Sequence, residues 1–299
     1  MLDVLIEPLN YEYMRNALFA SALIGCVCAF LSAFLVLKGW SLIGDALSHS
    51  VVPGVAGAYA LGLPFSIGAF FAGFLASMSI AVIRKLSSLR EDAIIGFVFT
   101  TFFAAGMLII SLNPTSININ AVILGNILII SQYDLYQIVG ICLVSLILLL
   151  LFWKDLALVF FDENQAKISG LKVQTLKVLF FSVLSACVVA SLQAVGAILV
   201  IAMVITPGAT AYLLTDRFSK MLVLACAIGV FSSLIGTYLS YFVDGVTGGL
   251  IVLTQTAVFA IALICSPKYG LIKGNKLTKP ALGDKANSHL PENSLEQKL

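Results

Sequence analysis

The sequence predicts an all-α protein, a polytopic transmembrane helical bundle. Of its 299 residues, 60% are hydrophobic and only 11% are charged, whereas soluble proteins carry about 25% charged residues. The mean hydropathy is +1.06. The apolar residues gather in long runs, and a helix needs about 20 such residues to cross a membrane. A water-soluble core could not bury this much apolar surface, so we expect an integral membrane protein.

Nine apolar runs are long enough to count as spans, and the pattern allows eight to ten. The second run is short and rich in glycine, and the sixth and seventh meet at Gly196 with almost no loop. A further apolar piece, residues 121–130, has the length of a segment that enters the bilayer without crossing it. In chain order, the expected spans are residues 16–37, 47–62, 65–83, 93–111, 133–153, 175–194, 195–214, 221–243 and 248–266.

Lysine and arginine residues predict the orientation of these spans. Basic residues are enriched in cytoplasmic loops, and here they occupy alternate connections, whereas residues 111–132 and 244–249 contain none. Nine spans with the N-terminus outside and the C-terminus in the cytoplasm satisfy this bias. We therefore expect an N-terminal extracytoplasmic arm at residues 1–15, one membrane domain at residues 16–270 and a polar cytoplasmic tail at residues 271–299. The tail has the composition of a disordered segment.

A polar stretch between the first two spans, residues 44–50 (GDALSHS), contains Asp45 and His49. Ionised groups inside a bilayer cost roughly 2.5–3.5 kcal/mol each, so they are seldom present without a partner or a task. At a spacing of i and i+4, the two side chains share one face of a helix. A carboxylate and an imidazole provide half of a divalent transition-metal site. Alternatively, Asp45 caps the second span and His49 bonds to a backbone carbonyl.

The longest basic connection contains a short predicted helix at residues 161–171 (FDENQAKISGL). Asp162 suits the N-cap, Glu163 suits the first turn, Ala166 favours helix and Gly170 is a natural stop. An ordinary helix at the membrane surface is the more common explanation of this pattern.

Several functions are not supported by the sequence. A net charge of +2 does not suggest nucleic-acid binding. No G-x-x-x-x-G-K-[ST] loop occurs, so we expect no ATP hydrolysis by this chain. No polar segment is long enough to form a solute-binding domain.

Four segments, taken in order, resemble motifs of the membrane subunit of bacterial ABC importers for manganese, iron or zinc. They are residues 38–56 (KGWSLIGDALSHSVVPGVA), 91–96 (EDAIIG), 161–171 and 204–211 (VITPGATA). The resemblance extends over roughly residues 15–270. The pattern is similar to the Yfe- and Sit-type permeases of chelated iron and manganese systems.

This resemblance implies a fold similar to the vitamin B12-type importer permease, in the bacterial inner membrane. It implies three kinds of partner: a second permease subunit, identical or paralogous, a cytoplasmic ATPase dimer and an extracytoplasmic metal-binding protein. Asp45 and His49 would coordinate the transported Mn²⁺, Fe²⁺ or Zn²⁺ together with the same pair of the second subunit. No permanently bound cofactor is implied. The helix that couples transport to the ATPase would contain Asp162, Glu163, Ala166, Gly170 and Leu171.

Two alternatives remain open at this stage. One is a proton-coupled secondary metal transporter, in which Asp45 and His49 relay protons and no docking helix is needed. The other is a vitamin or siderophore ABC permease, which would have a wide pathway and would transport the chelate.

Overall fold

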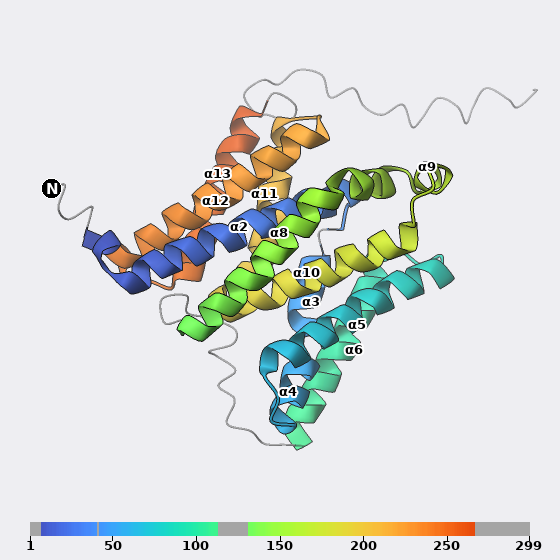
Figure 1. Cartoon of the computed structure of the whole chain (residues 1–299), viewed down its shortest axis with the longest axis horizontal. Coiled ribbons are helices and arrows are strands. Elements are labelled where there is room, and N and C mark those ends of the chain that lie inside the picture. Colours follow the sequence, from blue (N-terminus) through green and yellow to red (C-terminus); the bar gives the residue numbers. More distant parts are fainter. Residues whose placement is uncertain (1–6, 41, 113–130, 267–299) are drawn as a thin grey trace, which may run out of the picture.

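The computed structural model describes residues 7–40, 42–112 and 131–266, and within these residues it contains α-helices and no β-strand (Figure 1). The all-α prediction is therefore confirmed. The helices are α2 (Glu12–Lys38), α3 (Ile43–Ser50), α4 (Val52–Ala60), α5 (Phe65–Leu86), α6 (Glu91–Leu112), α8 (Gln132–Phe161), α9 (Glu163–Ile168), α10 (Val173–Val195), α11 (Ala197–Leu214), α12 (Phe218–Val243) and α13 (Thr247–Cys265).

Seven of these helices are long and apolar enough to cross a membrane, fewer than the nine spans predicted. The second predicted span is divided at Val51 into α3 and α4. Pro53, in the first turn of α4, cannot donate the N–H that would continue the helix from α3. The seventh predicted span corresponds to α11, whose 18 residues, Ala197–Leu214, lie at the short end of the range of about 17–25 residues for a transmembrane helix. The predicted segments at residues 121–130 and 271–299 lie outside the described residues.

Helix α2 lies at the centre of one half of the bundle, where it packs against α8, α10, α11 and α12 (Figure 1). Small residues permit this close approach. A Cβ atom on Gly25 would meet the Gly229 carbonyl oxygen of α12 at 2.7 Å. The hydroxyl of Ser32 links α2 to α11, since it donates to the Ile205 carbonyl at 2.9 Å and accepts from the Gly208 N–H at 3.0 Å. Packing of small residues and hydroxyl bonds is how helices associate inside lipid.

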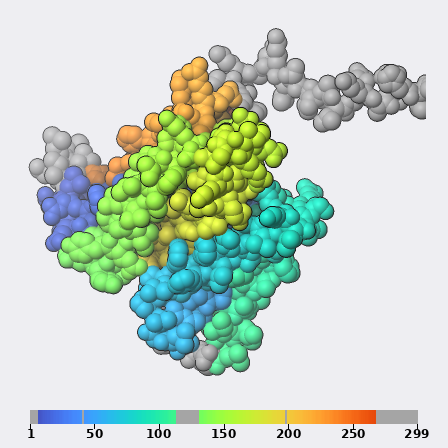
Figure 2. Space-filling view, turned by 45° about the vertical axis from the view of Figure 1, so that its right-hand side comes forward, coloured from blue at the N-terminus to red at the C-terminus, as the bar shows by residue number. Residues whose placement is uncertain are grey.

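Helices α4, α5 and α6 form the other half of the bundle, and α10 joins the two halves. Figure 2 shows α9 and α10 (yellow-green) beside α5 (cyan) on one face of the molecule. The Ser185 hydroxyl of α10 donates to the Phe70 carbonyl of α5 at 3.1 Å. The short helix α3 lies between these halves, in contact with α5, α6, α10 and α11.

Several predicted cytoplasmic connections meet at the same end of the bundle. The Lys38 ammonium, in the last turn of α2, donates to the Phe160 carbonyl at the end of α8 at 3.0 Å. The guanidinium of Arg84, in the last turn of α5, lies 4.7 Å from the centre of the Trp40 ring. The rings of Phe161 and Phe218 lie 5.7 Å apart and bring the start of α12 to this end. Which side of the membrane this end faces stays a prediction.

Candidate metal site and docking helix

The candidate metal ligands lie on α3, which begins earlier than the sequence predicted. The second span was expected to start at residue 47, but α3 starts at Ile43. Ile43 and Leu47 are one helical turn apart and both are buried, so their packing extends the helix toward the N-terminus. Leu42 is the N-cap residue. Asp45 therefore lies within the first turn, and the alternative in which it caps this helix is wrong.

Asp45 and His49 share one face of α3, as their spacing predicted. The Asp45 Oδ1 and His49 Nε2 atoms are 3.5 Å apart, and the side chains are 45% and 38% exposed. In a tetrahedral site with bonds of about 2.0–2.1 Å, two ligand atoms stand roughly 3.4 Å apart. The observed separation therefore allows both atoms to bind one ion with little movement.

Two aromatic rings of α6 hold the imidazole. The rings of Phe99 and Phe103 lie 5.4 Å and 5.9 Å from the His49 ring. The contact covers part of the imidazole with apolar surface and restricts its rotation. The sequence analysis missed both phenylalanines. Their i, i+4 spacing also suits rings that face lipid, and only the contact between α3 and α6 brings them to the site.

The site is incomplete within the described part of the chain. Asp45 and His49 supply two ligands, and no group of three or more His, Cys, Asp or Glu side chains able to hold a metal is found among the residues described. Structural and catalytic zinc sites use three or four protein ligands. The partial exposure of the pair leaves both ligand atoms accessible to a further donor.

The second candidate site is α9, and its two ends follow the predicted pattern. Asp162 is the N-cap, and its Oδ1 accepts hydrogen bonds from the Asn164 and Gln165 N–H groups at 2.9 Å and 3.0 Å. Gly170 has φ +78°, a conformation that glycine adopts without strain. The chain then reverses, and the Leu171 N–H donates to the Ala166 carbonyl at 3.1 Å. Both expected signals, the cap and the glycine stop, are therefore present.

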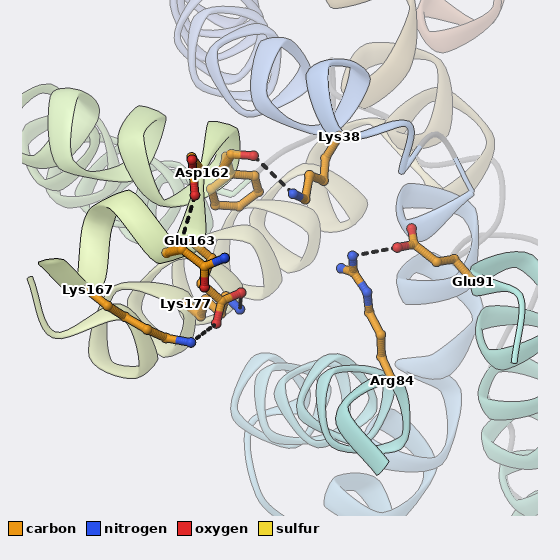
Figure 3. Close-up of polar contacts among 9 residues, drawn as sticks. Lys38, Arg84, Glu91, Asp162, Glu163, Lys167 and Lys177 are labelled. Carbon is orange, nitrogen blue, oxygen red and sulfur yellow. Dashed lines mark hydrogen bonds and ion pairs between the residues drawn. The ribbon is translucent and has the colours of Figure 1, made fainter. Parts of the chain in front are cut away.

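A salt bridge to α10 anchors α9 to the bundle (Figure 3). The Glu163 carboxylate lies 2.5 Å from the Lys177 ammonium of α10 and 3.2 Å from the Lys167 ammonium. The hydrogen bond from Lys177 is the main reason that the pKa of Glu163 is lowered, and Lys167 adds to it. Lys177 was missed as part of this site, because 14 residues separate it from Glu163.

The described side chains of α9 divide into an anchoring face and an exposed face. Ala166 is fully buried against the bundle, whereas Ile168 is 82% exposed and Asn164 and Gln165 are exposed. Of the residues expected to couple α9 to a partner, Ala166 therefore packs inward and cannot touch a partner itself. The exposed part of α9 combines two amides, the Lys167 ammonium and one large apolar side chain, all accessible to a partner.

Comparisons with known proteins place these features in a family. The model of the ABC 3 transport family matches residues 10–266. The chain is similar to the chelated iron transport system membrane proteins YfeC and YfeD of Yersinia pestis, with 58% identity over 99% of this chain and 100% of YfeC, and 40% identity over 100% of this chain and 99% of YfeD. It is also similar to the manganese transport system membrane protein MntB of Synechocystis, with 48% identity over 90% of this chain and 88% of MntB.

A solved structure shares the fold. PsaBC from Streptococcus pneumoniae, determined in complex with a Fab, has a chain that superposes with a TM-score of 0.79 at 35% sequence identity. The match covers 90% of this chain and 98% of that chain. The likeness therefore extends over most of this chain.

Proposed function

The chain belongs to the ABC 3 transport family, and from this premise we propose that it is the membrane-spanning permease of an ATP-driven importer for Mn²⁺ or Fe²⁺. Its relatives are named as membrane proteins of iron and manganese transport systems. It is a transport component and not an enzyme, and ATP hydrolysis belongs to a separate ATPase. The multi-pass membrane character follows from its seven apolar helices.

The Asp45–His49 pair is the observation that carries the metal assignment. Its oxygen and nitrogen atoms are 3.5 Å apart on a short helix between long apolar spans. Carboxylate and imidazole ligands suit Mn²⁺, Fe²⁺ and Zn²⁺, whereas Cu(I) prefers sulfur. The transported ion would pass this pair as substrate.

The second half of the site would come from a second permease subunit. One chain contributes one carboxylate and one imidazole, and a matching pair across a dimer would complete a four-ligand site. Yersinia pestis has two proteins of this kind, YfeC and YfeD, and both resemble this chain. A paralogous heterodimer is therefore as consistent with these findings as a homodimer.

Helix α9 would dock on the cytoplasmic ATPase. Its exposed amides and Ile168 supply a contact surface, and the Glu163–Lys177 salt bridge transmits displacement of α9 to α10. Helix α10 packs on α3, which holds Asp45 and His49. Movement of the docking helix thus has a direct mechanical route to the metal ligands. An extracytoplasmic binding protein would deliver the ion to the opposite end, and the N-terminus would lie outside.

The metal assignment is tested by uptake of radioactive Mn²⁺ and Fe²⁺ into cells that lack other importers for these ions. Asp45→Ala and His49→Ala should each lower uptake by at least about tenfold, as loss of a metal ligand removes an essential bond. His289→Ala is the matched control, because His289 is the only other histidine in the sequence. Uptake that persists in either site variant at normal protein levels would disprove the role of the pair.

A liposome experiment separates the ATP-driven mechanism from the proton-coupled alternative. The purified chain, reconstituted without an ATPase, should not accumulate Mn²⁺ or Fe²⁺ under a pH gradient. Accumulation under these conditions would favour the secondary transporter. Uptake of a chelated ion, without uptake of the free ion, would favour the vitamin or siderophore permease.

A further inference from the structure

A cavity of about 450 Å³ opens at the end of the bundle where Lys38, Arg84 and Lys85 lie. Neither Asp45 nor His49 lines it. Helices α2, α5 and α8 end around it, α6 and α10 begin there, and α9 forms one wall. Its volume is within the range of about 300–1,000 Å³ that is typical of small-molecule sites. Buried apolar side chains form its floor, among them Trp40, Ile43, Ile80, Ile94, Phe160 and Phe181.

Charged side chains line the cavity and are mostly positive. Five cationic side chains and two carboxylates contribute, a net charge of +3: Lys38, Arg84, Lys85, Lys167, Lys177, Glu91 and Glu163. Figure 3 shows Lys38 and the residues around α9 on one side, and Arg84 with Glu91 on the other. Both carboxylates are already paired, Glu91 with Arg84 at 2.5 Å and Glu163 with Lys167 and Lys177.

Two of the lysines, Lys38 and Lys85, have no carboxylate partner among the residues that the structure describes. Lys38 donates to a neutral backbone carbonyl. Lys85 forms no ion pair or side-chain hydrogen bond with any residue that the structure describes, and it is exposed. The two lysines would attract the charged part of an anionic ligand. The apolar side chains below them would contact apolar groups of the same ligand.

The length of α5 leads us to expect the cavity at the depth of the lipid headgroups. Lys38 ends α2, and Arg84 and Lys85 are in the last turn of α5. The 22 residues of α5 rise about 33 Å, close to the thickness of roughly 30 Å of a bilayer hydrocarbon core. We therefore expect the end of α5 at a membrane interface, where lipid phosphates are abundant.

We propose that this cavity binds the phosphate of an anionic phospholipid, with the phosphate near Lys38 and Lys85 and the start of an acyl chain on the apolar floor. Basic pockets between transmembrane helices bind anionic lipid headgroups in this way. A free phosphate ion shares the charged chemistry but would make no use of the buried floor. The proposal does not depend on the transported substrate.

Trp40 provides the reporter, because it lines the cavity and the sequence has only one other tryptophan, Trp153. In the full-length Trp153→Phe protein in detergent, phosphatidylglycerol with brominated acyl chains should quench the fluorescence of Trp40 in a saturable manner. Brominated phosphatidylcholine, which has no net charge, should quench it only at higher concentration. Equal quenching by the two lipids would overturn the proposal.

Charge substitutions locate the phosphate. Lys38→Gln and Lys85→Gln should each weaken phosphatidylglycerol binding by about fivefold, the contribution of one lysine near an anionic surface. Arginine at the same positions should preserve binding, which distinguishes loss of charge from misfolding. Lys220→Gln is the matched control, since Lys220 is exposed in the first turn of α12 at the same end and does not line the cavity. Equal weakening in Lys220→Gln would mean that the general surface charge attracts the lipid and would refute the cavity site.

Calorimetry with inorganic phosphate distinguishes the two sources of the anion. No saturable binding of phosphate is expected at concentrations that do not screen surface charge. Saturable binding of inorganic phosphate, with no preference for brominated phosphatidylglycerol over phosphatidylcholine, would assign the cavity to a free anion and refute the lipid site.

Discussion

Single glycines decide how closely neighbouring helices approach. Gly54 of α4 and Gly68 of α5 pack so tightly that a Cβ atom on either residue would overlap the backbone of the other helix. Gly57, one turn later on α4, has no atom within 4 Å of the position of its missing Cβ. Two glycines of one short helix therefore differ in function, although the sequence presents them alike.

We predict that Gly54→Ala destabilises the protein by about 1–3 kcal/mol, the usual cost of overpacking. Gly57→Ala is the matched control and should be neutral or slightly stabilising, because alanine favours helix over glycine. Thermal unfolding in detergent measures both variants. A similar melting temperature for the two variants would contradict the described contact between α4 and α5.

Glu163 makes the anchor of α9 sensitive to acid. Lys177 lowers the pKa of this carboxyl group, so the charged form stabilises the folded position of α9. This stabilisation is complete above the pKa of an ordinary glutamate, about 4.3. It is lost as the pH falls from there through the lowered pKa, where the carboxylate is protonated.

We predict that hydrogen exchange in α9, corrected for intrinsic rates, becomes faster as the pH falls through this range. Glu163→Gln should exchange faster at neutral pH and lose the acid dependence, because it lacks the titrating group. If hydrogen exchange in Glu163→Gln still became faster at low pH, the acid dependence would come from another residue and not from Glu163.

At the scale of elements, short helices carry both candidate sites. Helices α3 and α9 have 8 and 6 residues, whereas the apolar spans have 19 to 30. Isolated helices this short are not stable in water, so packing and end caps hold them. Helix α3 depends on contacts with five helices, α4, α5, α6, α10 and α11. Helix α9 depends on Asp162, Gly170 and the Glu163–Lys177 salt bridge.

The end of α9 supplies a prediction about coupling. Gly170→Val places a β-branched residue at φ +78° and should cost roughly 1–2 kcal/mol or more. The strain should displace α9 and lower metal uptake per ATP hydrolysed by the complete transporter. Gly170→Asn is the control, since asparagine tolerates this conformation and no neighbouring atom lies within 4 Å of the added Cβ. Equal coupling in the two variants would show that the conformation at Gly170 has no part in docking.

At the scale of the whole molecule, a single chain supplies two candidate ligands, which is half of the proposed metal site. Asp45 and His49 are partly exposed, and the described residues offer no third ligand beside them. The apolar helices make this chain a membrane protein, but its proposed activity needs a second permease subunit. The affinity of the proposed site for metal should therefore depend on assembly of this chain with a second permease subunit.

We predict that the isolated chain binds Mn²⁺ weakly and that the assembled permease dimer binds it at least about tenfold more tightly. Two additional ligands would account for such a gain, since loss of supporting groups around a metal commonly costs 10–100-fold in affinity. Metal retained after size-exclusion chromatography measures both species. His49→Ala in the dimer should abolish the gain, and equal affinity of monomer and dimer would contradict a shared site.

The features that the sequence determined by itself are those that depend on neighbours along the chain. Apolar composition established a membrane protein, helical spacing placed Asp45 and His49 on one face, and Asp162 and Gly170 marked the ends of α9. Only the tertiary structure decided contacts between distant segments. Phe99 at His49, Lys177 at Glu163 and the basic cavity depend on which helices pack together. Apolar spans resemble one another in sequence, so their periodicity does not indicate which helices pack together. Close packing of small residues determines which helices become neighbours.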